Sequence, residues 1–163
     1  MANHSIPDPA AGRGPDKLLA IGVYGETVAA YRYVVMSEKT DSAEHRREFE
    51  AMADEEQEHK ERLQKLVEQM YPGQQFVLTQ DDKDLVVTGP RLLDIRNERD
   101  FLEAMEMVLS TERKTAKFYA NYGKYMPDAG VQALFKELAE EGVEHYQRLK
   151  ALAREVGVTE FEA

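Results

Sequence analysis

The stretch ADEEQEHKERL at residues 53–63 decides the fold of this chain, because a near copy, AEEGVEHYQRL, returns at residues 139–149. The offset from one to the other is 86 residues, and it holds without a gap across two predicted helices and the turn between them. The matching positions pair Glu26 with Glu112, Ala30 with Ala116, Tyr33 with Tyr119, Phe49 with Phe135, His59 with His145, and Leu63 with Leu149. One offset shared by so many positions indicates a duplicated helical hairpin, folded with pseudo-two-fold symmetry.

Helix start and stop signals divide the chain into long helical segments. Helices are expected at about residues 16–39, from 41 or 42 to 70, 97–124, and from just after 128 to 156. Short connections join the first two and the last two, so each pair is an antiparallel hairpin. The intervening residues 72–96 are long for a loop, and they fit a crossover that travels the length of a bundle. This crossover contains two short β-like runs, residues 76–79 and 85–88, around the acidic turn QDDKD.

The pattern therefore predicts an all-α fold, a four-helix bundle made of two hairpins and one long crossover. The first residues are rich in Pro, Gly and Ala and have no periodicity, which is typical of a disordered arm. The predicted organisation is an N-terminal arm at residues 1–15, a bundle at 16–157 and a C-terminal tail at 158–163.

Composition excludes several classes of function. The 163 residues contain 21 Lys and Arg against 31 Asp and Glu, so a net charge of -10 argues against a nucleic-acid partner. The absence of cysteine excludes disulfides, thiol catalysis and cysteine-ligated metals. The most apolar stretch, residues 18–36, carries Glu26 and Arg32 and is predicted to be a buried helix rather than a membrane span. A cytoplasmic location is the default expectation.

Polar residues interrupt the apolar stripe of every long helix. Steps of three and four place Glu26 within the stripe of the first helix and Glu112 within that of the third. The second helix carries Glu56 and His59 one turn apart, and the fourth carries His145. A buried, unpaired carboxylate costs on the order of several kcal/mol, so this concentration of inward polarity requires compensation.

A metal centre supplies that compensation. Glu56 and His59 lie three residues apart on one helix face, and the pseudo-symmetry brings Glu26, Glu112 and His145 to the same level of the bundle. Carboxylate and imidazole ligands on an inward face suit iron, manganese or zinc. The alternative is a buried polar network that holds no metal.

Four segments carry a family resemblance: GETVAAYRY, ADEEQEHKERL, TERKTAKFY and LAEEGVEHYQRL. With them the chain resembles a rubrerythrin or erythrin-like member of the ferritin-like di-iron carboxylate superfamily over about residues 16–156. The cysteine-rich rubredoxin domain of classical rubrerythrins is absent from the sequence. The resemblance implies that the metal ligands are Glu26, Glu56, His59, Glu112 and His145.

The same resemblance implies a function. It implies a di-iron site, with zinc or manganese as other candidates, and oxidoreductase or ferroxidase chemistry with O₂ or peroxide. Electrons would come from an external donor protein, and the chain would form a homodimer. The alternatives are a bundle that holds or buffers metal without turnover, and a purely structural bundle.

The sequence departs from the family pattern at two positions. The second Glu-x-x-His motif has Gly142 where the family has a glutamate that bridges two metals, and Thr115 replaces a further glutamate. Three carboxylates remain to balance two divalent cations, so we expect unequal affinities, with the half formed by Glu26, Glu56 and His59 binding more tightly. Water, an external anion or Glu141 would complete the other half. Gly142 also removes side-chain volume, which suggests an opening to the site.

Two tyrosines share the inward face with the ligand glutamates. Tyr33 and Tyr119 lie two turns beyond Glu26 and Glu112, respectively. We expect their hydroxyls to hydrogen-bond to the ligand carboxylates.

Overall fold

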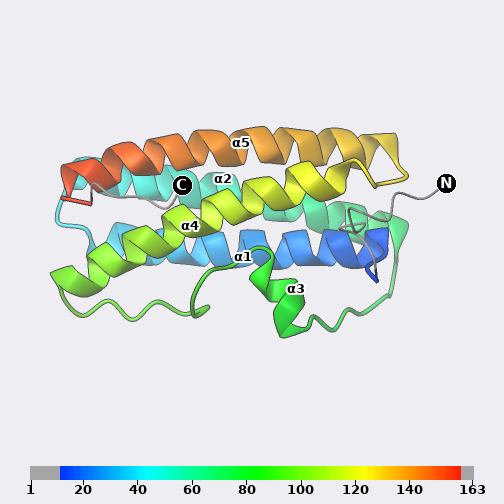
Figure 1. Cartoon of the computed structure of the whole chain (residues 1–163), viewed down its shortest axis with the longest axis horizontal. Helices are drawn as coiled ribbons and strands as arrows, with labels where there is room; N and C mark the ends of the chain where they lie inside the picture. The colour runs from blue at the N-terminus through cyan, green and yellow to red at the C-terminus, as the bar shows by residue number, and fades with distance from the viewer. Residues whose placement is uncertain (1–11, 159–163) are drawn as a thin grey trace, which may run out of the picture.

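The computed structural model describes residues 12–158, and this part of the chain is entirely helical apart from turns and loops (Figure 1). Its helices are α1 (Pro15–Lys39), α2 (Ala43–Met70), α3 (Gln80–Asp84), α4 (Glu98–Gly123) and α5 (Ala129–Glu155). The four long helices confirm the predicted all-α architecture, and their ends lie within two residues of the expected positions. Most of the predicted arm, residues 1–11, and residues 159–163 of the predicted tail lie outside the described residues.

Local sequence signals explain where the long helices begin. Pro15 occupies the first turn of α1, where its missing N–H costs nothing. The side chains of Ser42, Asn97 and Asp128 accept hydrogen bonds from the backbone N–H groups three residues later and so cap α2, α4 and α5. Each cap satisfies a donor that has no partner inside its helix.

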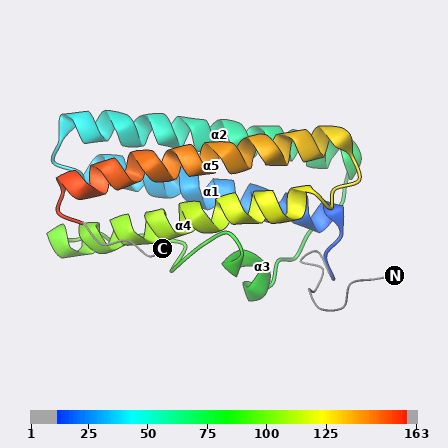
Figure 2. The same cartoon turned by 45° about the horizontal axis from the view of Figure 1, so that its top comes forward.

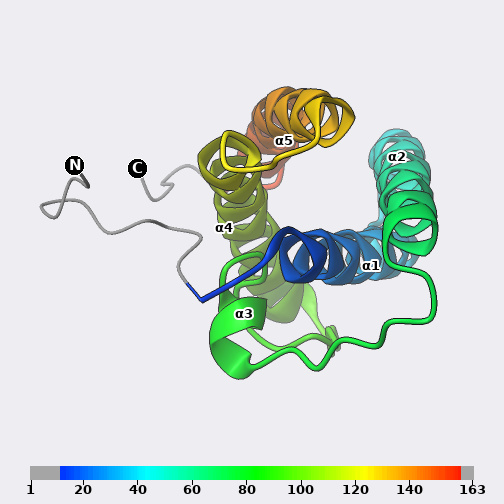
Figure 3. The same ribbon diagram turned by 90° about the vertical axis from the view of Figure 1, so that its right-hand side faces the viewer.

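The long helices form two hairpins that lie side by side. Figure 3, which looks along the bundle, shows α1 beside α2 and α4 beside α5, with α1 and α4 adjacent at the centre. The helices α2 and α5 lie on the outside of this arrangement and approach each other less closely than the partners within a hairpin. The seam between α2 and α5 is therefore bridged by long side chains.

The crossover returns along the length of the bundle beneath α1 and α4, as Figure 2 shows. The two β-like runs, residues 76–79 and 85–88, do not form strands, and no strand is present among residues 12–158. The acidic turn between them is instead the short helix α3, which begins with a capping box formed by Thr79 and Asp82. The apolar side chains of Val86 and Val87 are buried against the bundle, so they have packing partners but no partner strand.

Two residues of α1 hold the crossover in place. Arg32 is 1 % exposed, and its guanidinium donates to the carbonyl oxygens of Thr88 and Pro90, both at 2.7 Å, and to Thr111 Oγ1 at 3.0 Å. At Gly25 a Cβ atom would lie 2.9 Å from Val86 Cβ, so glycine permits the close approach of the crossover to α1.

A polar layer divides the core at mid-bundle. One apolar cluster surrounds Met36, Phe49 and Leu149 at one end, and a second surrounds Leu19 and Phe135 at the other. The glutamates and histidines that were predicted to face inward lie between these clusters. Residues 18–36 form the buried middle of α1, and within residues 12–158 we find no helix with the length and apolarity needed to cross a bilayer.

Candidate metal centre

The five predicted ligands meet in the polar layer, and none is more than 4 % exposed. They are Glu26 from α1, Glu56 and His59 from α2, Glu112 from α4, and His145 from α5. Each long helix contributes because its inward stripe carries one or two polar residues at the same height. The tertiary structure thus brings together every residue that the sequence singled out for a metal.

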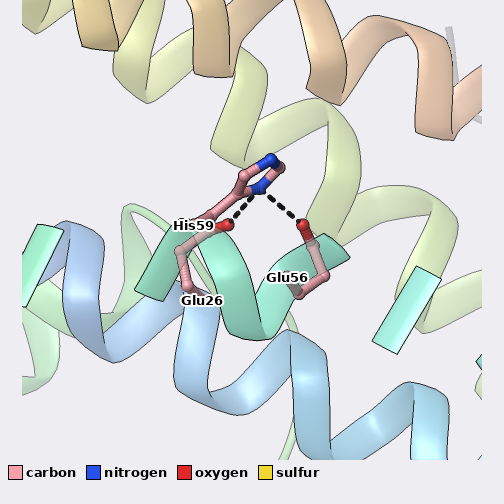
Figure 4. A group of neighbouring side chains, drawn as sticks. All are labelled: Glu26, Glu56 and His59. Atoms are coloured by element: carbon pink, nitrogen blue, oxygen red, sulfur yellow. Dashed lines mark hydrogen bonds and ion pairs between the residues drawn. The ribbon is translucent and has the colours of Figure 1, made fainter. Parts of the chain in front are cut away.

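Three of these residues form a tight group between α1 and α2. His59 Nδ1 lies 3.0 Å from Glu26 Oε1 and 3.1 Å from Glu56 Oε1, as Figure 4 shows. The spacing of three residues puts Glu56 and His59 on adjacent turns of one face, so the imidazole contacts Glu56 of its own helix as well as Glu26 of α1. One nitrogen and two carboxylate oxygens therefore converge from two helices.

A second group lies beside the first and shares Glu56 with it. His145 Nδ1 lies 3.6 Å from Glu56 Oε1 and 3.8 Å from Glu112 Oε2. In each group of three, the potential ligand atoms all lie within 4.8 Å of one another. The two groups differ in closeness, because the distances from His59 are shorter than those from His145.

The buried carboxylates of the polar layer favour positive charge beside them. Burial raises the pKa of Glu56 well above its usual value, and the charges of Glu26 and Glu112 raise it further. Burial alone would lower the pKa of His59, but Glu26 and Glu141 outweigh it and raise the pKa to about 9. Burial likewise opposes the charged form of His145, but Glu112, Glu56 and Glu55 raise its pKa to about 10.

The outer nitrogens of both imidazoles are anchored across the seam between α2 and α5. His59 Nε2 on α2 lies 3.1 Å from Glu141 Oε1 on α5, and His145 Nε2 on α5 lies 3.0 Å from Glu55 Oε1 on α2. Each motif therefore orients the histidine of the other motif. A carboxylate on the far nitrogen fixes the ring of a metal-binding histidine and raises its basicity.

This crossed arrangement was only partly visible in the sequence. We expected Glu141 to be a candidate for completing the group around His145, whereas in the structure it bonds to His59. The contact between Glu55 and His145 was missed altogether. The available signal was the repeat itself, since Glu55 and Glu141 match at the offset of 86 residues.

Tyr33 and Tyr119 hydrogen-bond to two of the predicted ligand carboxylates, and each bond links one hairpin to the other. Tyr33 of α1 donates to Glu112 Oε1 of α4 at 2.8 Å, and Tyr119 of α4 donates to Glu26 Oε2 of α1 at 3.0 Å. Burial raises the pKa of both phenols well above the usual value, and the carboxylate that each contacts raises it further. Both hydroxyls therefore remain protonated hydrogen-bond donors at neutral pH.

Gly142 lies in the core on α5, at the position equivalent to Glu56. A Cβ atom at Gly142 would lie 3.1 Å from Ala116 Cβ on α4, so α4 and α5 are in close contact at this point. The repeat pairs Ala116 with Ala30, and it therefore places the same alanine opposite Glu56 in the other hairpin. The second hairpin therefore contributes one carboxylate fewer to the polar layer than the first.

The donor set fits a pair of metal ions. It comprises three buried carboxylates and two imidazoles, and the Nδ1 atom of each imidazole faces the carboxylates. Oxygen and nitrogen donors of this kind suit iron, manganese and zinc. Glu56 Oε1 faces both histidines, so the two groups have this carboxylate in common.

Comparisons with known proteins agree on the type of fold. A model of the rubrerythrin family matches residues 17–153. A hypothetical protein from Pyrococcus furiosus has a similar structure, with a TM-score of 0.77 and 23% identity over 91% of this chain and 93% of that chain. KatB, a manganese catalase from Anabaena, has a TM-score of 0.66 and 18% identity, covering 100% of this chain and 85% of that chain. No curated protein sequence matches.

Proposed function

The chain belongs to the rubrerythrin family, and we propose that it is a di-iron or dimanganese carboxylate protein with redox chemistry toward peroxide or O₂. The observation that carries the proposal is the pair of three-residue groups that share Glu56 in a buried layer. Iron is the first candidate, in keeping with the family, and the likeness to a manganese catalase makes manganese the second.

The residues of the chain have distinct roles in this proposal. Glu26, Glu56 and His59 would hold one ion, and Glu56, Glu112 and His145 would hold the other. When bound in the reduced state, the metal pair supplies the two electrons that, with two protons, convert peroxide to two water molecules.

The surrounding side chains hold this ligand set in one geometry. Glu141 and Glu55 fix the two imidazole rings, so the ligand nitrogens need little reorientation to bind. Tyr119 and Tyr33 each fix one oxygen of Glu26 and Glu112, leaving the other oxygen of each carboxylate facing a histidine. The apolar clusters above and below exclude water, which strengthens the electrostatic attraction between the carboxylates and a cation.

A bundle that holds metal without turnover is the second candidate. It is favoured by one observation, the presence of Gly142 in place of a glutamate, because a missing bridging carboxylate weakens one of the two metal positions. In this case the protein would bind one ion tightly and would not cycle between oxidation states.

Anaerobic loading followed by exposure to peroxide separates these candidates. The purified protein is freed of metal, loaded with Fe(II) or Mn(II) without oxygen, analysed for metal content and then mixed with peroxide. Peroxide consumption that repeats after re-reduction supports the redox function, whereas bound metal with no consumption supports the second candidate. Protein that binds neither metal would contradict both.

A matched pair of variants ties the outcome to the proposed site. Glu26→Gln removes a ligand of the closer group, whereas Glu58→Gln makes the same change at an exposed position on α2. We expect Glu26→Gln to lose metal and peroxide consumption, and Glu58→Gln to match the natural protein. Equal behaviour of the two variants would place the chemistry elsewhere.

Two partners belong to the same proposal. Since the sequence contains no cysteine, an external protein would return electrons to the metal pair. A homodimer would cover the outward face of α1, where Tyr31 and Val34 are 40% and 45% exposed. Sedimentation velocity at micromolar concentration tests the dimer.

A further inference from the structure

Aromatic side chains lead from the metal layer towards the surface at the end of α4. The Tyr119 ring centre lies 5.2 Å from that of Phe118, and the Phe118 ring centre lies 5.1 Å from that of Tyr122, which are distances of direct aromatic contact. Tyr125 N–H donates to the Tyr122 carbonyl oxygen at 3.0 Å, so a third tyrosine follows one turn later. The exposed fraction rises along this tyrosine series, from 1% at Tyr119 to 6% at Tyr122 and 44% at Tyr125.

The inner end of the tyrosine series contacts a predicted metal ligand. The Tyr119 hydroxyl donates to Glu26 Oε2 at 3.0 Å, and Glu26 Oε1 lies 3.0 Å from His59 Nδ1. A phenol that loses an electron also loses its proton, and direct proton transfer needs an acceptor within about 2.6–3.2 Å. The Glu26 carboxylate is such an acceptor. Tyr119 can therefore lose an electron and a proton together, beside the metal position formed by Glu26, Glu56 and His59.

The matching positions of the first hairpin lack this series. The offset of 86 residues pairs Tyr119, Tyr122, Tyr125 and Phe118 with Tyr33, Met36, Lys39 and Arg32, respectively. Tyr33 also donates to a ligand carboxylate, but its ring stacks on Phe49, which in turn contacts Phe101. The two hydroxyls therefore have the same role in fixing a carboxylate, and that role does not account for the further tyrosines that follow Tyr119.

Peroxide reduction creates a need for an electron from the protein when one metal position is empty. Conversion of peroxide to two water molecules takes two electrons and two protons, whereas one ion that passes from the divalent to the trivalent state supplies one electron. The second hairpin has Gly142 where the first has Glu56, so the position near His145 has one carboxylate fewer from its own hairpin. A protein that holds metal at the first position alone is one electron short.

We propose that Tyr119 supplies this second electron, and that Tyr122 and Tyr125 carry the resulting radical to the surface, where a small hydroquinone in solution reduces it. The proposal rests on the proposed function, because it needs a metal ion held by Glu26, Glu56 and His59. It makes Tyr119 a redox-active residue, whereas Tyr33 at the matching position only fixes its carboxylate.

Electrons and atoms balance in this reaction. One Fe(II), one tyrosine, one H₂O₂ and one H⁺ give one Fe(III), one neutral tyrosyl radical and two H₂O, and the bond that breaks is the O–O bond. The phenolic proton of Tyr119 moves to Glu26 Oε2 and returns when Tyr122 reduces Tyr119. Tyr125 at the surface loses its proton to solvent. A hydroquinone then gives one hydrogen atom to the Tyr125 radical, which restores the phenol and leaves a semiquinone in solution.

Electron paramagnetic resonance of the protein with one ion bound tests the proposal. The metal-free protein is loaded without oxygen with one equivalent of Fe(II), mixed with one equivalent of H₂O₂ and frozen at intervals. We expect an organic radical whose hyperfine splitting narrows when the protein is made with ring-deuterated tyrosine. Hydroquinone added before the peroxide should remove this signal without changing the amount of peroxide reduced in the first turnover.

A matched pair of variants identifies the electron donor. Tyr119→Phe and Tyr33→Phe each remove one hydroxyl from a ligand carboxylate, so damage to the metal layer should be similar in both. Tyr119→Phe should abolish the tyrosyl radical, whereas Tyr33→Phe should retain it. Iron content and circular dichroism check that both variants fold and bind Fe(II).

Covalent products identify the outer end of the series. Radicals on exposed tyrosines couple between molecules, so the natural protein should form dityrosine-linked dimers, and mass spectrometry of their peptides identifies the residues that are joined. Tyr122→Phe and Tyr125→Phe should each abolish these dimers and leave a radical at Tyr119. Tyr31→Phe changes a tyrosine of α1 that is 40% exposed, and it should leave the dimers unchanged.

The possible results distinguish this inference from the proposed function. Peroxide reduction by the protein with one ion bound, without a tyrosyl radical, overturns the role of Tyr119 and leaves the metal centre standing. A radical that survives Tyr119→Phe, or that is lost equally in Tyr33→Phe, also overturns it, because the donor is then another residue or the two hydroxyls act alike. Dimers that persist in Tyr125→Phe overturn the exit at that residue. A protein that binds no Fe(II), or that leaves peroxide intact, overturns the proposed function and this inference with it.

Discussion

The hairpin of α1 and α2 and the hairpin of α4 and α5 have matching sequences, and in the polar layer they differ at one position, where Glu56 is matched by Gly142. In the first copy Glu56 stands one turn before His59, with His59 Nδ1 at 3.0 and 3.1 Å from its two carboxylates. In the second copy Gly142 precedes His145, and His145 Nδ1 lies 3.8 Å from Glu112 of its own copy and 3.6 Å from Glu56 of the first. The apolar stripes are nevertheless retained in both copies, so the core does not depend on a carboxylate at position 142.

The carboxylates that contact the outer nitrogens of the two histidines also differ in their own partners. Arg148 of α5 donates to Glu55, which in turn anchors His145. The equivalent Arg62 of α2 pairs with Glu137 instead, and Glu141 Oε2 has no hydrogen-bond partner within the described part of the chain. The carboxylate that anchors His145 is therefore itself held by an arginine, whereas one oxygen of the carboxylate that anchors His59 has no hydrogen bond within residues 12–158.

Removal of the shared ligand should have the largest effect. Because Glu56 Oε1 faces both histidines, Glu56→Gln should weaken metal binding at both positions by more than about 100-fold, the most that is lost when a residue only orients a ligand and does not touch the metal. The metal-free variant should be at least as stable as the natural protein, since a buried carboxylate has been neutralised. Calorimetric titration and thermal denaturation measure the two effects, with Glu58→Gln as the control. Retention of one tight site would show that the two copies do not share this ligand.

Removal of one histidine or the other should abolish metal binding at different positions. His145→Ala should abolish the second equivalent of metal and leave the first within a few-fold of its natural affinity. His59→Ala should abolish the tighter equivalent, because the closer group is built around its Nδ1 atom. Metal stoichiometry by elemental analysis after dialysis decides between one bound ion and none. Equal losses in the two variants would mean that the copies bind metal with equal strength.

Removal of Glu55 or Glu141 should have a smaller effect on metal binding, and in each case at the histidine of the other hairpin. Glu141→Ala should weaken the position at His59, and Glu55→Ala the position at His145, each by about tenfold, the lower end for loss of a carboxylate that orients a metal-binding histidine. The lower end applies because both side chains are about a third exposed, so solvent screens them. Nitrogen shifts of the two imidazoles in NMR spectra report which ring has lost its partner. An effect on the histidine of the same helix would contradict the crossed arrangement.

The smallest effect on metal binding should come from the crossover, which lies outside the duplicated hairpins. Asp82 caps α3 and pairs with Arg13 and Lys17, and although burial opposes its charge, the bond from Thr79 N–H and these two cations hold its pKa well below the usual value. Asp82→Asn should cost about 1 to 2 kcal/mol of unfolding free energy at neutral pH and leave metal affinity unchanged.

The pH dependence of stability checks the same residue. A lowered pKa in the folded state means that Asp82 stabilises the fold above the unfolded carboxyl pKa of about 3.9, and that this contribution is lost as the pH falls below that value. The stability difference between the natural protein and Asp82→Asn should therefore stay constant from pH 7 to about 4 in urea denaturation and shrink only as the pH is lowered further. The exposed Asp81→Asn should follow the natural protein at every pH. A difference between the natural protein and Asp82→Asn that stays constant below about pH 4 as well would assign the effect to packing rather than to charge.

Much of the candidate site was accessible from the sequence because helical periodicity is a local property. The steps of three and four that place Glu26 and Glu112 inward depend only on the pitch of a helix. The offset of 86 residues then puts His59 and His145 at matching heights, and the short connections make each hairpin antiparallel. The structure places all four in one layer.

The crossover was harder to predict, because its form depends on distant partners. The runs at residues 76–79 and 85–88 have the apolar character of strands, but a strand also needs a neighbouring strand, and the bundle offers only helix surfaces. Buried Arg32 likewise lacks any local signal, since its partners Thr88 and Thr111 are far away in sequence.

The sequence by itself thus determined the four long helices, their pairing into two equivalent hairpins and the set of inward carboxylates and imidazoles. Only the tertiary structure decided which carboxylate orients which histidine, because periodicity fixes the direction of a side chain but not the spacing of helices. The wide seam between α2 and α5 lets Glu55 and Glu141 reach across to the opposite histidine. The close contact of α4 and α5 at Gly142 likewise depends on the distance between two helices, so it appears only in the folded chain.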